Sequence, residues 1–80
     1  MEEVTSQVFN EYINKHAENV ICSGNIRAKI TYIIVRKESC YDLVAFYSIG
    51  DNYMFGRISI HETAGCAIDS MATLLKNCKG

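Results

Sequence analysis

The most reactive side chains in the sequence belong to four cysteines and two histidines. No two of the cysteines form the Cys-X-X-Cys pair that is typical of structural zinc sites. Their even number would also allow disulfides, which small secreted proteins often contain. Free thiols, buried or incidental, are the favoured interpretation, with disulfides and a metal site as alternatives. The four cysteines are Cys22, Cys40, Cys66 and Cys78.

Cys66 and His61, five residues apart, are the candidates for a nucleophilic Cys–His pair, and His16 is distant from them in the sequence. Such a pair needs a hydrogen bond between thiol and imidazole, and a third group that orients the base. Within a helix, the spacing of these two residues places them on different faces, so the pair is not expected to form. Gly50 and Gly56 flank a predicted strand and do not make a phosphate-binding loop. We therefore expect no enzyme activity, no cofactor and no metal.

The composition is that of one small folded domain over residues 1–80, with 49% apolar residues. The formal net charge is −1, from 8 basic and 9 acidic residues. Nucleic-acid binders usually carry a basic excess, so any basic patch must come from an uneven distribution of charge. No apolar run is long enough to cross a membrane. The acidic N-terminus is unlike a signal peptide, which favours the cytoplasm of a cell or of an infected host.

Two helices are predicted, over residues 2–19 and 60–77, because apolar residues recur there every three or four positions. The break after the first helix is Ser23-Gly24-Asn25. The second helix has two candidate starts. Ser59 would form a capping box with Glu62, whereas Thr63 would allow a longer preceding strand.

Three strands are predicted between the helices, over residues 27–37, 42–49 and 53–58, because apolar and polar residues alternate there. Short turns at Glu38-Ser39-Cys40 and Gly50-Asp51-Asn52 favour an antiparallel meander. The fold class is therefore α+β, in the order α-β-β-β-α. Because each strand has one clearly apolar face, both helices are expected on the same face of a three-stranded sheet.

The other face of this sheet is expected to be open, with an apolar strip bordered by basic residues. Interaction surfaces commonly have this composition. The partner would be another protein or a second copy of the chain, since a net charge near zero does not oppose self-association. The predicted partner-binding residues are Arg27, Lys29, Ile33, Val35, Lys37, Phe55 and Arg57.

The order of elements and two segments resemble the double-stranded RNA-binding domain. Phe9-Asn10-Glu11-Tyr12-Ile13-Asn14-Lys15-His16 is similar to the first helix of that family. Gly56-Arg57-Ile58-Ser59 is similar to its approach to the second helix, and an Ala-rich face follows. The resemblance covers roughly residues 4–76. It implies two helices on one face of the sheet and three regions that contact RNA.

Two of those three regions depart from the family pattern. The second helix opens with Ile60 and His61 instead of the lysines that would contact phosphates, and the first strand loop lacks Gly-Pro-x-His. Losing about three phosphate contacts lowers affinity by orders of magnitude. An RNA-binding version would have to use Glu11, Asn14, Lys15, Arg36, Lys37 and His61.

These features together predict a non-enzymatic binding module. The first hypothesis is a small protein-interaction adaptor or inhibitor, a role that would suit a phage or viral protein acting on a host factor. A homodimer is included in this hypothesis. The alternative is a double-stranded RNA-binding protein with an atypical contact surface.

Overall fold

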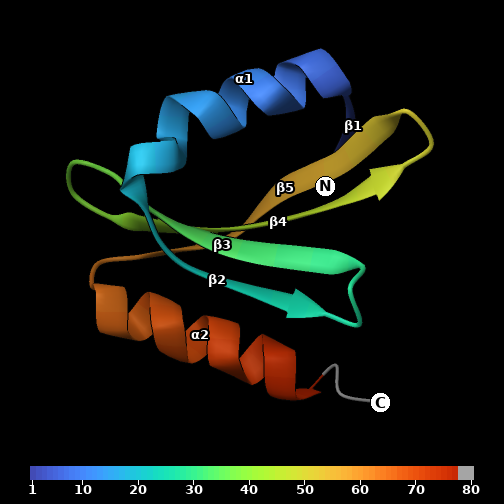
Figure 1. Ribbon diagram of the computed structural model, residues 1–80. Helices are drawn as coiled ribbons and strands as arrows, with labels where there is room; N and C mark the ends of the chain where they lie inside the picture. Colours follow the sequence, from blue (N-terminus) through green and yellow to red (C-terminus); the bar gives the residue numbers. More distant parts are fainter. Residues whose placement is uncertain (78–80) are drawn as a thin grey trace.

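The structure is a computed structural model that describes residues 1–77 (Figure 1). The chain forms β1 (Glu2–Thr5), α1 (Ser6–His16), the 3-10 turn η1 (Ala17–Asn19), β2 (Val20–Ile26), β3 (Ile30–Arg36), β4 (Tyr41–Ile49), β5 (Asn52–His61) and α2 (Ala64–Asn77). Within this part of the chain, the strands form one five-stranded antiparallel sheet in the order β1-β5-β4-β3-β2. No helix of residues 1–77 is long and apolar enough to span a bilayer.

The predicted three-stranded sheet and the order α-β-β-β-α are wrong, because the start of the first predicted helix and the segment that follows it are both strands. β1 pairs with β5, with Glu2 opposite Phe55. β2 begins at Val20, runs through the predicted break at Ser23-Gly24-Asn25 and pairs with β3. Alternate β2 residues are partly buried, which is the pattern of a strand with one face on the core. Pairing with apolar β3 thus outweighs the low strand propensity of Gly24 and Asn25.

The expectation that both helices share one face is also wrong. Figure 1 shows α1 above the sheet and α2 below it. The central strands β3 and β4 are apolar on both faces, so each face needs a cover. The α1 side buries Ile33, Val35 and Val44. The α2 side buries Tyr32, Ile34, Leu43 and Ala45 against Ala67 and Met71.

The helix starts agree with local capping chemistry. Thr63, not Ser59, precedes α2, and its Oγ1 accepts a hydrogen bond of 3.1 Å from the Cys66 amide. β5 continues through Ser59 to His61, as the longer-strand alternative predicts. At α1, the Thr5 hydroxyl accepts from the Val8 amide at 3.2 Å. Both threonines satisfy an amide that has no partner inside its helix.

A tight turn connects the two strands in each of two hairpins. In the β4–β5 hairpin, Gly50 has a φ of 60°, which confirms the predicted turn there. In the β2–β3 hairpin, Arg27 and Ala28 have φ values of 53° and 56°. The Lys29 amide closes this turn by donating a hydrogen bond of 2.9 Å to the Ile26 carbonyl. The strand predicted to begin at residue 27 therefore begins only at Ile30.

Candidate functional site

The apolar members of the predicted open face lie in the core. Ile33 and Val35 are 6% and 0% exposed, because α1 covers the face that was expected to be open. Phe55 packs against Tyr12 of α1, with ring centroids 4.6 Å apart. Ile33 and Val35 are therefore buried under α1, and Phe55 is partly buried there, so the predicted apolar strip is not an open face.

The basic members of the predicted face do not come together. Arg27 and Lys29 lie at the β2–β3 turn, whereas Lys37 follows the opposite end of β3. The seven residues of β3 span about 20 Å at the usual rise of a strand. Arg57 lies on β5 and forms an ion pair with Asp42.

A different part of the sheet is open, on the α2 side of β1, β5 and β4. Tyr53 and Phe55 both contact Phe9 of α1, so Met54 between them points to the opposite face. Figure 1 shows that the β4–β5 hairpin extends beyond α2 on this side. We call this surface the open sheet half; its apolar residues are Met1, Tyr47, Ile49, Met54 and Ile58.

The side chains of the open sheet half are markedly exposed for their type. Met1, Ile49 and Ile58 are 58%, 45% and 44% exposed. Met1 lies close to β5 because residue 56 is glycine, and a Cβ there would approach the Met1 Cα to 2.9 Å. At the rim, the Asn52 amide donates to the Glu3 carboxylate at 2.7 Å. The surface is thus apolar at its centre and polar at this edge.

A cleft of about 380 Å³ continues from Ile58 to α2, with Ser59 on one wall and Asp69, Ser70 and Thr73 on the other. The Ser59 hydroxyl lies 2.7 Å from His61 Nε2. A Ser–His pair can act as nucleophile and base when a third group orients the histidine. Within residues 1–77, His61 has no second hydrogen-bond partner. The pair is therefore a contact between neighbouring side chains of β5 and does not form a triad.

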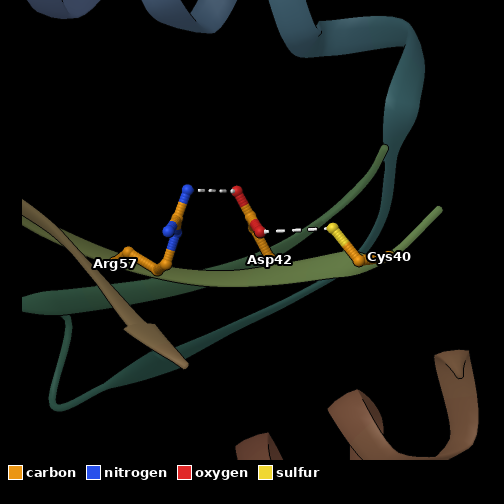
Figure 2. Close-up of polar contacts among 3 residues, drawn as sticks. All are labelled: Cys40, Asp42 and Arg57. Atoms are coloured by element: carbon orange, nitrogen blue, oxygen red, sulfur yellow. Dashed lines mark hydrogen bonds and ion pairs between the residues drawn. The ribbon is translucent and has the colours of Figure 1, made fainter. Parts of the chain in front are cut away.

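A buried carboxylate lies below the C-terminal part of α1. Asp42 is 4% exposed. Figure 2 shows its two contacts: Arg57 Nη2 lies 3.5 Å from Oδ2, and the Cys40 thiol lies 3.9 Å from Oδ1. Burial raises the pKa of Tyr12, and the negative charge of Asp42 raises it further. Asp42 is missing from the residues predicted from the sequence, although it is the one charged residue of β4 and interrupts an apolar strand.

A second cleft, of about 360 Å³, lies between the end of α1 and the β3–β4 turn. We call it the basic cleft; it is lined by His16, Asn19, Arg36, Lys37 and Glu38. The pKa of His16 is lowered, first by burial and then by the charges of Lys37 and Lys15, while Asp42 opposes this effect.

The residues expected of an RNA-binding version are only partly brought together. Arg36 and Lys37 line the basic cleft, and Lys15 is close enough to affect its histidine. Glu11 and Asn14 are exposed. His61 lies on β5, hydrogen-bonded to Ser59.

Three cysteines lie in the described part of the chain, and all are free thiols. Cys22 and Cys40 are half-buried, and Cys66 is exposed. Cys78 lies outside the described residues.

Comparison with known protein families, curated proteins and solved structures gave no match to the chain. The helix–three strands–helix plan on which the resemblance to the double-stranded RNA-binding domain depended is not the plan of this fold.

Proposed function

We propose that the chain is a non-enzymatic binding module whose open sheet half contacts another protein or a second copy of the chain. The observation that carries this proposal is the group of apolar side chains on an uncovered part of the sheet, with Met1, Ile49 and Ile58 about half exposed. A contiguous apolar surface with a polar rim is typical of a protein-interaction site.

The energetics favour a protein partner. Full burial of a large apolar side chain contributes about 1.5–3 kcal/mol, so covering these half-exposed residues would contribute on the order of 1 kcal/mol each. The net charge of −1 presents little electrostatic barrier to association. A small adaptor or inhibitor in the cytoplasm would have these properties. The free thiols of Cys22, Cys40 and Cys66 are consistent with that reducing compartment.

Charged substitutions on the open sheet half test this proposal. Ile49→Glu and Ile58→Glu should each remove a partner that copurifies with the tagged chain, because each places a carboxylate in the apolar contact. Ile68→Glu is the matched control, since Ile68 is 42% exposed but lies on α2. Circular dichroism and thermal unfolding should show that all three variants remain folded.

The proposal is supported if Ile49→Glu and Ile58→Glu lose the copurifying partner, or no longer form a dimer, while Ile68→Glu behaves like the unmodified chain. Equal loss from all three variants, or retention in all three, contradicts it.

A further inference from the structure

The basic cleft brings together hydrogen-bond donors from two separate parts of the chain. His16 and Asn19 come from the end of α1 and from η1, whereas Arg36 and Lys37 come from the end of β3 and the following turn. The dipole of α1 favours a cation in the last turn of the helix, where Lys15 lies. It has no such effect on Arg36 and Lys37, which reach the same cleft from β3 and the following turn.

Among residues 1–77, no carboxylate lies within ion-pair distance of the cations at this cleft. Within residues 1–77, the ion pair of the structure joins Arg57 and Asp42. Lys15, Arg36 and Lys37 form none, although Glu38 also lines the cleft. Three unpaired positive charges near one half-buried imidazole create a local positive potential in a chain whose net charge is −1.

The geometry points to a binding site for the phosphate group of a small ligand in the basic cleft. An arginine fork matches two phosphate oxygens, and lysine adds a compact positive charge. The Asn19 amide and the His16 imidazole supply further donors from the opposite wall. This assignment is independent of the proposed protein contact, because the open sheet half lies on the other side of the sheet.

The size of the cleft favours a small ligand over a nucleic-acid duplex. Its volume of about 360 Å³ is that of a small-molecule pocket. A double-stranded RNA-binding surface spans about 16 base pairs and contacts successive grooves. The other basic residues of the described chain do not extend the cleft into a continuous basic face. Arg27 and Lys29 lie at the far end of β3, Arg57 is paired with Asp42, and Lys76 lies in the last turn of α2.

His16 links binding to pH. Its pKa is lowered in the folded chain, so it is mostly neutral near neutral pH and becomes charged only as the pH falls. A bound phosphate would favour the imidazolium and raise that pKa. The charged and titratable groups that face His16 are Lys15, Lys37, Arg36, Glu38, Asp42 and Tyr12.

The test is an NMR titration of both histidines in inorganic phosphate and in chloride at equal ionic strength. Phosphate should raise the pKa of His16 by about one unit relative to chloride, which corresponds to about tenfold tighter binding to the protonated form. The ring signals of His61 are the control and should be the same in the two salts, because His61 lies outside the cleft. The titration is repeated with phosphoserine in place of inorganic phosphate. If phosphoserine raises the pKa of His16 at a lower concentration than inorganic phosphate does, the site favours a phosphate monoester over the free ion.

Arg36→Gln and Lys37→Gln should reduce the difference between phosphate and chloride, and Lys29→Gln should leave it unchanged. The readout is this difference, because removing Lys37 alone also raises the pKa of His16. The proposal is overturned if phosphate acts no more strongly than chloride, or if the Arg36→Gln/Lys37→Gln double variant keeps the full difference. It is also overturned, in favour of RNA, if a duplex raises the pKa of His16 where phosphate and phosphoserine do not.

Discussion

At the scale of single residues, Asp42 is the centre of the polar chemistry on the α1 side. Its carboxylate is buried, but Arg57, its ion-pair partner, has a side chain that is 56% exposed. Solvent screens such a pair, so it contributes little to stability. The larger effect of Asp42 is on its neighbours, because it raises the pKa of Tyr12 and opposes the lowering of the pKa of His16.

Asp42→Asn should therefore lower both pKa values. The pKa of Tyr12 should fall towards its ordinary value near 10, and that of His16 should fall further below 6.5, because the anion no longer stabilises the imidazolium. NMR titration of the two rings measures both shifts.

A loosened α1 would give a different result. Solvent exposure would move the pKa of Tyr12 downwards but that of His16 upwards, since burial is the largest cause of each shift. Opposite movements of the two values would thus contradict the electrostatic account of Asp42.

At the scale of elements, the β2–β3 turn stores backbone strain. Arg27 and Ala28 both adopt positive φ, where a side chain is unfavourable and glycine is not. The β4–β5 turn is the matched case, because Gly50 has a similar φ of 60° and no atom within 4 Å of the position of a Cβ.

Ala28→Gly should raise the free energy of unfolding by up to about 1 kcal/mol, and Gly50→Ala should lower it by about as much. The strain of positive φ, about 1–2 kcal/mol for an L-residue, exceeds the opposing change in the entropy of the unfolded chain. Chemical denaturation of the two variants measures these changes. If both substitutions shift stability in the same direction, positive φ is not the cause.

The elements that the sequence predicted well are those with strong periodicity. Residues 42–49 and the C-terminal helix show it clearly. The strand forms over the predicted residues, and the helix ends at Asn77 as predicted but begins at Ala64, after the later of its two candidate starts. β1 was missed because Glu2 and Glu3 resemble the first turn of a helix, where acidic residues are favourable. Its strand conformation comes from pairing with Met54 and Phe55, which are distant in sequence.

At the scale of the whole molecule, the predicted open face is wrong because β3 is buried on both faces. Ile33 and Val35 lie on one face, and Tyr32 and Ile34 beside them form a second, mainly apolar face. Such a continuous apolar run indicates a strand buried on both faces. Because α1 covers one face, the predicted strip is buried. On the other face, α2 leaves β1 and parts of β4 and β5 uncovered.

The basic cleft was only partly visible in the sequence. Lys15, Arg36 and Lys37 were named, but as separate RNA-contacting regions. Their proximity follows from the pairing of β2 with β3, which places Val20 opposite Val35 and so sets η1 beside the β3–β4 turn. An unpredicted strand therefore determines the site.

The most direct test of the open sheet half is photocrosslinking from single positions in producing cells. p-Benzoylphenylalanine at Ile58 should give one discrete adduct, whose mass identifies a second copy of the chain or another protein. p-Benzoylphenylalanine at Ile68 of α2 or at Val8 of α1, which are 42% and 51% exposed, should give little of this adduct. Adducts of equal yield from all three positions, or none from Ile58, would contradict a protein-binding role for this surface.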